Sequence, residues 1–155
     1  MIAAAASLGA ATACSDGSNG APASSSTQAP TTTERPDDGT LLVGAVLPTV
    51  GPAAEIGVSM SAALALAAQE INEAGGVNGR NVRVVIREEG DNAATALLAV
   101  QNLLQLGVDA IIGPTSSLDL LATLGTAVEA GVLTCAPSAS ALGLDSFPDG
   151  GLLVR

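Results

Sequence analysis

Two short runs of hydroxyl-bearing residues carry the side chains best suited to binding chemistry. Each run directly follows an apolar segment: the first is Thr115, Ser116 and Ser117, and the second is Ser138, Ala139 and Ser140. The first run opens a predicted helix, which Ser116 or Ser117 would cap with Asp119 in the first turn. Free backbone N–H groups and hydroxyls there can hold a carboxylate or a similar anion. Either run alone is also typical of a plain polar loop or helix cap. Two such runs at one edge of a sheet favour a site for a small polar ligand.

The chain lacks the side chains that would turn these serines into nucleophiles. It contains no His and no Lys, so it cannot hold a Ser-His-Asp set, a Cys-His set or a His-ligated metal. No G-x-S-x-G turn surrounds a serine, and the phosphate-binding patterns GxxxxGK[ST] and GxGxxG are absent. We therefore expect ligand binding without a metal or a cofactor, and no enzymatic activity.

Three carboxylates, Glu88, Glu89 and Asp91, follow a predicted strand and raise one enzymatic alternative. A pair of carboxylates can act as general acid and general base. The simpler interpretation is a solvent-exposed turn in which Asp91 or Asn92 caps the next helix. An enzyme of this kind would lose its turnover in the Glu88→Ala and Glu89→Ala variants.

The charge and the aromatic content exclude nucleic acid as a partner. The 155 residues carry 15 acidic side chains against five arginines, which gives a formal net charge of -10. Such a chain lacks the basic surface that nucleic acid requires, and its one aromatic residue, Phe147, cannot provide stacking platforms. The hydrophobic content of 48% consists mainly of aliphatic and small residues, which can still bury enough apolar area to fold.

The first 14 residues are typical of a bacterial export signal that ends in a lipid anchor. Met1 to Ala13 is apolar but too short to span a bilayer as a helix, and it resembles the apolar region of a secretory signal peptide. Small residues precede Cys14 as in a lipobox, so we expect Cys14 to be lipidated. A free or buried cysteine in a tail is the alternative. Cys135 is then left without a disulfide partner and is expected in a buried strand.

Residues 15–39 are expected to form a disordered tether between this anchor and a folded domain at residues 40–155. The segment consists mainly of Ser, Thr, Pro, Gly and Ala, and it shows no apolar periodicity. It cannot bury enough surface to offset the entropy that is lost when a chain becomes ordered.

From residue 40 onward, strand and helix patterns alternate along the chain. Strands are predicted at 40–47, 81–87, 109–112, 132–136 and 152–154, and helices at 53–74, 91–106 and 116–130. Spacing predicts the inward faces of the first two helices, which are Ile56, Met60, Leu64, Ala67 and Ile71, and then Leu97, Leu98 and Leu104. The order predicts an α/β fold with an open, mainly parallel sheet and helices on both faces. Ligands of such sheets bind at the carboxyl ends of the strands, where both hydroxyl runs are expected.

Four segments together resemble the N-terminal portion of bacterial extracellular solute-binding proteins of the leucine/isoleucine/valine-binding type, which serve ABC transporters. The segments are VGAVLPTVGPAAEIG, AALALAAQEINEAGGVNGRNVRVVIREEGDN, AVQNLLQLGVDAIIGPTSS and GVLTCAPSASALGL. The resemblance implies a type I periplasmic-binding fold, in which two α/β lobes close on a ligand. Because family members are much longer, it also implies that residues 40–155 form an incomplete first lobe.

The resemblance further implies how the two runs would grip an amino acid. Ser117 would donate a hydrogen bond to the ligand carboxylate, with Thr115 and Ser116 lining the pocket. Ser138 would offer its backbone carbonyl to the ligand ammonium group, and Ser140 would contribute its hydroxyl and its N–H.

Two more positions belong to the implied pocket. Ala139 lies between the two serines of the second run. Ile56 stands before Gly57, where family members often carry an aromatic residue, and this difference weakens the case for a branched-chain ligand.

We therefore expect a lipid-anchored, non-enzymatic substrate-binding component of an ABC importer, which delivers amino acids or small amides to permease subunits. It would lie on the outer face of the cytoplasmic membrane or in the periplasm. The ligand-binding half of a sensor or receptor, and a truncated remnant without binding activity, are the alternatives.

Overall fold

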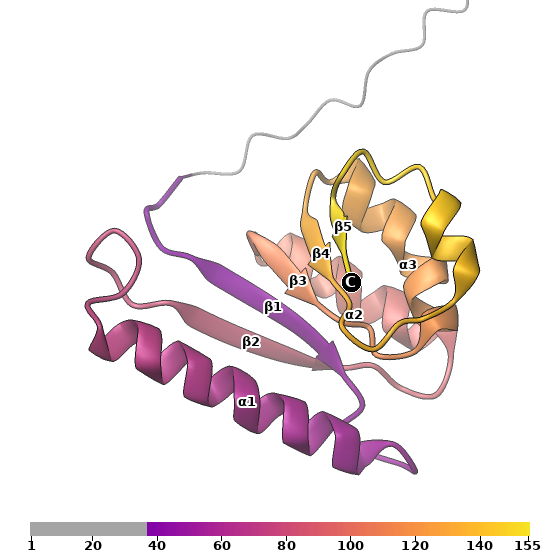
Figure 1. Cartoon of the computed structure of the whole chain (residues 1–155), viewed down its shortest axis with the longest axis horizontal. Coiled ribbons are helices and arrows are strands. Elements are labelled where there is room, and N and C mark those ends of the chain that lie inside the picture. Colours follow the sequence, from indigo (N-terminus) through magenta and orange to yellow (C-terminus); the bar gives the residue numbers. More distant parts are fainter. Residues whose placement is uncertain (1–36) are drawn as a thin grey trace, which may run out of the picture.

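The computed structural model describes residues 37–155, which form the coloured part of Figure 1. The predicted export signal, Cys14 and the predicted tether up to residue 36 lie outside the described residues. The folded part begins close to the predicted domain boundary at residue 40, since the first strand starts at Leu42.

Five strands form one parallel sheet in the order β2-β1-β3-β4-β5. They are β1 (Leu42–Leu47), β2 (Arg83–Glu88), β3 (Ala110–Ile112), β4 (Leu133–Cys135) and β5 (Leu153–Val154). The chain runs from β1 to β2 on one side and then crosses back to β3 on the other side. The strand order therefore reverses between β1 and β3, and the carboxyl ends of strands at such a switch point leave room for a ligand.

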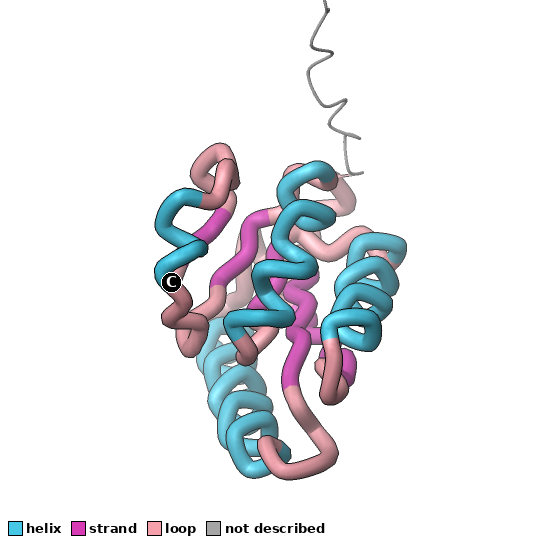
Figure 2. Tube along the Cα trace, turned by 90° about the vertical axis from the view of Figure 1, so that its right-hand side faces the viewer, coloured by secondary structure: helices cyan, strands magenta, loops and turns pink. Residues whose placement is uncertain are grey.

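Helices cover both faces of this sheet. The helix α1 (Ala54–Glu73) packs against one face, whereas α2 (Ala93–Gln105) and α3 (Ser117–Glu129) contact each other on the opposite face (Figures 1 and 2). A short 3-10 helix, η1 (Leu142–Ser146), precedes β5. The connections through α1 and α2 run in opposite directions across the sheet. Because both crossovers are right-handed, the two helices must lie on opposite faces. The predicted fold class is confirmed.

The core lies mainly between the sheet and the pair formed by α2 and α3. Its larger cluster consists of Val46, Ala99, Val100, Leu103, Val108, Ile111, Ala127 and Val132. A second cluster beside η1 consists of Leu120, Leu124, Ala136, Ala139 and Leu144. Within residues 37–155, no helix is both long enough and apolar enough to cross a membrane.

The predicted inward face of α1 is wrong in part. Met60 and Leu64 are half-buried, but Ile56 is 53% exposed and Ile71 is 40% exposed. The helix is apolar around most of its circumference, so apolar spacing alone does not define its packed face. Gly57, the one buried residue of α1, defines it instead: a Cβ there would overlap the carbonyl oxygen of Pro48. The absence of a side chain lets α1 lie directly on the end of β1.

The inward face of α2 also differs from the prediction. Leu98 is 66% exposed, and the buried residues of the helix are Ala96, Ala99, Val100 and Leu103. The small alanines let the helix approach the sheet closely, and Leu103 fills the core between them. Of the predicted inward residues, Leu97 is half-buried and Leu104 packs against the core cluster, so only Leu98 is wrong. Of the two predicted caps, the structure uses Asn92, whose side chain accepts hydrogen bonds from the backbone N–H groups of Ala94 (3.0 Å) and Thr95 (3.1 Å).

Candidate functional site

The two hydroxyl runs lie together at the carboxyl edge of the sheet, in the loops that follow β3 and β4. Ser117 Oγ accepts hydrogen bonds from the backbone N–H groups of Ser140 (3.0 Å) and Ala141 (3.2 Å). Ser138 Oγ donates to the carbonyl oxygen of Thr115 at 3.0 Å. Residues 23 and 24 positions apart in the sequence are thereby joined directly. The two loops form one hydrogen-bonded unit.

Ser117 keeps hydrogen-bond donors for a ligand. Its oxygen accepts two N–H groups, so its own hydroxyl hydrogen is left to donate, and no acceptor for it lies within reach in residues 37–155. Ser117 and Leu118 are the first two residues of α3, and their N–H groups have no acceptor inside the helix. Together with the positive end of the helix dipole, these donors suit a carboxylate.

The start of α3 agrees with the prediction. Ser116 is the N-cap, and its Oγ accepts a long hydrogen bond of 3.4 Å from the N–H of Asp119. Asp119 lies in the first turn, where a negative charge is favourable. The Ser116 oxygen therefore caps the helix, and the hydroxyl hydrogens of Ser116 and Ser117 are both left without an acceptor among residues 37–155.

Gly113 sets the path of the loop after β3. Its φ is +90°, a conformation that residues with side chains rarely adopt. A Cβ on Gly113 would also overlap the carbonyl oxygen of Val46 in β1. The glycine thus brings the loop against the end of β1, at the switch point of the sheet.

Glu89 is a site residue that the sequence interpretation missed. A solvent-exposed turn was predicted, but Glu89 is only 2% exposed. Its Oε2 accepts from the N–H (3.0 Å) and the hydroxyl (2.6 Å) of Thr115, and its Oε1 accepts from the N–H of Ser116 (2.8 Å). These two N–H groups are therefore occupied, and the backbone donors of this loop that stay without an acceptor are those of Ser117 and Leu118. Strand alternation, which places Glu88 and Glu89 on opposite sides, was the one signal in the sequence.

Glu88 holds the loop after β1 in a comparable way. Its carboxylate accepts hydrogen bonds from the hydroxyl and the N–H of Thr49, and from the N–H of Gly90 at 3.0 Å. The Thr49 hydroxyl, helped by the backbone donors, lowers the pKa of Glu88 below its ordinary value, although desolvation works in the opposite direction. Glu88 and Glu89, two of the three carboxylates of the enzymatic alternative, are thus engaged by donors of the protein itself.

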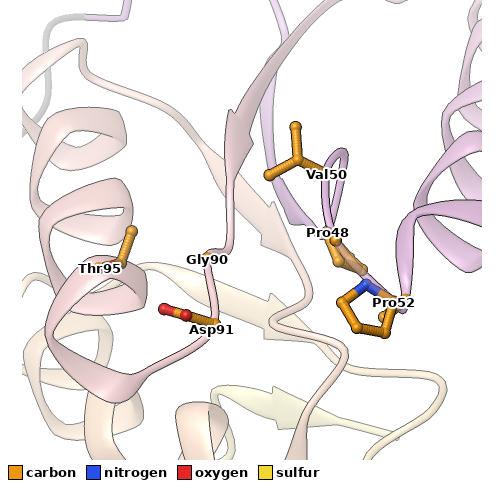
Figure 3. Close-up of a pocket in the computed structure, with 8 residues that line it drawn as sticks. Pro48, Val50, Pro52, Gly90, Asp91 and Thr95 are labelled. Atoms are coloured by element: carbon orange, nitrogen blue, oxygen red, sulfur yellow. The ribbon is translucent and has the colours of Figure 1, made fainter.

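A cavity of about 440 Å³ lies beside this site, between the loops that follow β1 and β2. Figure 3 shows Thr95 and Asp91 on one side of it and Val50, Pro48 and Pro52 on the other. Its volume falls in the range of small-molecule sites, and its walls are mainly apolar. Its lining does not include Ile56, which lies nearby in the first turn of α1 with its side chain mostly exposed.

Metal-ligating side chains do not gather in the described part of the chain. Within residues 37–155, no group of three or more His, Cys, Asp or Glu residues is arranged to hold a metal ion. Cys135 lies in β4 as predicted, but it is half-buried where a buried residue was expected, and it carries a free thiol.

Comparison with known proteins gives relatives that are amino-acid-binding or transporter substrate-binding proteins. The leucine-, isoleucine-, valine-, threonine- and alanine-binding protein of Pseudomonas aeruginosa is 29% identical over 102 residues, which are 66% of this chain and 27% of that protein. The branched-chain amino acid transporter substrate-binding protein of Streptococcus pneumoniae, solved in complex with isoleucine, is 34% identical with a TM-score of 0.64. This match covers 68% of this chain and 30% of that protein.

A second solved structure shows the same partial coverage. The ABC transporter substrate-binding protein of Desulfitobacterium hafniense, solved with leucine, is 25% identical with a TM-score of 0.63 over 70% of this chain and 32% of that protein. The chain thus spans about a third of the length of these relatives or less. The matched region is the N-terminal part of the type I periplasmic-binding fold.

The family model described as periplasmic binding protein matches residues 40–151, which are nearly all of the folded part. The Pseudomonas relative is an amino-acid-binding protein, and the Streptococcus relative is the substrate-binding protein of a branched-chain amino acid transporter. The resemblance predicted from the sequence is therefore confirmed, and the chain belongs to the periplasmic binding protein family.

Proposed function

We propose that residues 40–155 form part of the first lobe of a substrate-binding protein of an ABC importer, which captures amino acids or similar small polar solutes. Three findings support this proposal. The chain belongs to the periplasmic binding protein family. Two solved relatives hold isoleucine and leucine. The hydroxyl runs lie together at the carboxyl edge of the sheet, where ligands of open sheets bind.

The hydrogen bonding of Ser117 is the observation that carries the proposal. Two N–H groups from the loop after β4 fix its oxygen, so its hydroxyl hydrogen points away from them and can donate to a ligand carboxylate. The N–H groups of Ser117 and Leu118 add two donors at the start of α3. In this arrangement Thr115 and Ser116 line the pocket, and their N–H groups are taken by Glu89.

The loop after β4 is assigned the ammonium side of the ligand. The backbone carbonyl of Ser138 would accept from the ammonium, and Ser140 would contribute its exposed hydroxyl. The N–H of Ser140, which the resemblance also assigns to the ligand, instead donates to Ser117 Oγ at 3.0 Å. Ala139 is 6% exposed and packs in the cluster beside η1, so it fixes this loop to the core between the two serines. Ile56 would lie near the ligand side chain at the rim of the site.

Capture by two lobes explains why one lobe is expected to bind weakly. A ligand drives closure only through the extra affinity that it has for the closed state, and that affinity comes from contacts with both lobes. An acidic group that completes the ammonium site is expected on the opposing lobe. The closed complex would then deliver the solute to the permease subunits.

The anchor and the location belong to the same proposal. Cys14 would carry a diacylglyceryl group and residues 15–39 would tether the lobe. One acyl chain anchors a protein only marginally, so a diacylated cysteine is the sensible anchor. The protein would then work at the outer face of the cytoplasmic membrane or in the periplasm.

A titration of the 155-residue chain with L-leucine, followed by NMR of the backbone amides, tests the proposal. We expect weak binding in the millimolar range, with shifts confined to residues 114–118 and 138–141 and to Ile56 at the rim. Leucinamide, which lacks the carboxylate, is expected to leave the Ser117 and Leu118 amides unshifted. Shifts elsewhere, or no shifts at saturating leucine, would contradict the proposal.

A pair of variants controls this titration. Ser117→Ala removes the proposed donor and is expected to weaken leucine binding about tenfold. Ser59→Ala removes an exposed hydroxyl that bonds only to a carbonyl within α1, so it should bind like the wild type. Equal binding by both variants would exclude Ser117 from the site.

A further inference from the structure

We infer that Glu89 is a positioning residue, whose buried carboxylate holds the loop after β3 in the shape that receives the ligand. The ligand in this inference is the one in the proposed function, whereas the hydrogen bonds of Glu89 are observed independently of any ligand. Glu89 is 2% exposed and accepts three hydrogen bonds, two from Thr115 and one from Ser116. A buried carboxylate is costly unless its oxygens are satisfied, so this loop and this side chain stabilise each other.

The position of Glu89 at the end of β2 explains how its side chain contacts the loop after β3. It directly follows β2, whereas Thr115 follows β3, and β1 lies between these two strands. The N–H of Glu89 donates to the carbonyl oxygen of Leu47 at 2.9 Å, which fixes its backbone to the end of β1. Its side chain therefore passes across the end of β1 and fills the switch point from the β2 side.

The hydrogen bonds of Glu89 also restrain the loop after β4, through Thr115. Thr115 is held by Glu89 on its N–H and its hydroxyl, and its own carbonyl oxygen accepts from Ser138 Oγ at 3.0 Å. Ser117, two residues further along, accepts from the N–H of Ser140. A single carboxylate thus fixes a chain of hydrogen bonds that links the ends of β2, β3 and β4.

Glu89 also directs where a ligand carboxylate can bind. It occupies the N–H groups of Thr115 and Ser116, which are otherwise the first free donors in this loop. Its negative charge opposes a second carboxylate at the same place. The ligand is therefore directed to Ser117 and to the first turn of α3.

Amide hydrogen exchange of the 155-residue chain tests this role without any ligand. Glu89→Gln keeps one carbonyl oxygen but places an amide NH₂ against a backbone donor. We expect exchange at the Thr115 and Ser116 amides to accelerate at least about tenfold, while the amides of β1 exchange as in the wild type. Glu70→Gln, an exposed substitution on α1 with the same change of charge, should leave all of these rates unchanged.

Two results would overturn the inference. Unchanged exchange at Thr115 and Ser116 in Glu89→Gln would show that the carboxylate does not hold the loop. Equal acceleration in the loop and in β1 would show a general contribution to stability and no positioning role. If Glu89→Gln does not fold, Thr115→Val, which removes one of the three donors, must still accelerate exchange at Ser116.

A leucine titration of the same variants separates this inference from the proposed function. If the wild type binds leucine at Ser117, Glu89→Gln must bind it about tenfold more weakly, and Glu70→Gln must bind it equally. Equal binding by Glu89→Gln would refute the positioning role. If the wild type does not bind leucine, the proposed function fails, and the exchange rates alone decide the role of Glu89.

Discussion

The Oε1 atom of Glu89 lies 2.8 Å from the backbone nitrogen of Ser116, although 27 positions separate the two residues in the sequence. This hydrogen bond joins the end of an edge strand to the first turn of α3 across the end of β1. It places a protein carboxylate on donors that a free loop would offer to a ligand. The backbone donors of the loop that stay without an acceptor consequently begin at Ser117, whose hydroxyl hydrogen also has no partner among residues 37–155.

A side chain at Gly57 is predicted to separate α1 from the sheet. A Cβ there would overlap the carbonyl oxygen of Pro48, so Gly57→Ala should lower the free energy of unfolding by about 1–3 kcal/mol. Urea unfolding followed by circular dichroism measures the loss.

Gly125→Ala is the matched control for this substitution. Gly125 also lies within a helix, but its Cβ would meet only Phe147, at 3.9 Å. Alanine there should raise the stability by up to about 1 kcal/mol through helix propensity. A loss at Gly125 as large as the loss at Gly57 would show that the contact with Pro48 is not the cause.

The hydrogen bonds to Glu88 predict a contribution to stability that depends on pH. Because the pKa of Glu88 is lowered in the folded state, chiefly by the Thr49 hydroxyl, its contribution is present above the pKa of an unfolded glutamate, about 4.3. It is lost as the pH falls through the folded-state pKa. The stability difference between the wild type and Glu88→Gln should therefore be largest near neutral pH and shrink in acid.

The Thr49→Val variant controls for the source of this effect. It removes the hydroxyl that donates to Glu88, so it should reduce the pH-dependent part of the difference. Unfolding curves at a series of pH values provide the measurement. A difference that is constant with pH, or that grows in acid, would contradict the assignment.

Lipidation of Cys14 is predicted when the chain is expressed with its first 14 residues in a bacterium that processes lipoproteins. Mass spectrometry of the N-terminal peptide should show a chain that begins at Cys14 and carries a diacylglyceryl group. The Cys14→Ser variant should lack this mass and leave the membrane fraction. An unmodified Cys14 within an uncleaved N-terminus would argue against the anchor.

The order of the elements was predictable because it depends on local patterns. Short apolar runs closed by Pro or Gly gave the strands, and Ser116 was one of two caps predicted for α3. The meeting of the two hydroxyl runs followed from topology, since the carboxyl ends of parallel strands share one edge. These predictions required no knowledge of which side chains touch.

The packed faces and the role of Glu89 were not predictable in the same way. In alanine-rich helices, apolar residues surround the axis, so close backbone approach at Gly57 decides what is buried and Leu98 is left exposed. Glu89 accepts hydrogen bonds from Thr115 and Ser116, which lie 26 and 27 positions away in the sequence and on the other side of β1. Strand alternation places it on the opposite side from its neighbour Glu88, but the sequence does not show which of the two carboxylates is buried.

A crystal structure of the 155-residue chain grown in saturating L-leucine tests the central claim most directly. We predict the leucine carboxylate within hydrogen-bond distance of Ser117 Oγ and of the Ser117 and Leu118 N–H groups, and the ammonium at the carbonyl oxygen of Ser138. The carboxylate of Glu89 should keep its bonds to Thr115 and Ser116. Leucine in the cavity beside Val50 and Asp91, or leucine that displaces Glu89 from the loop, would contradict the claim.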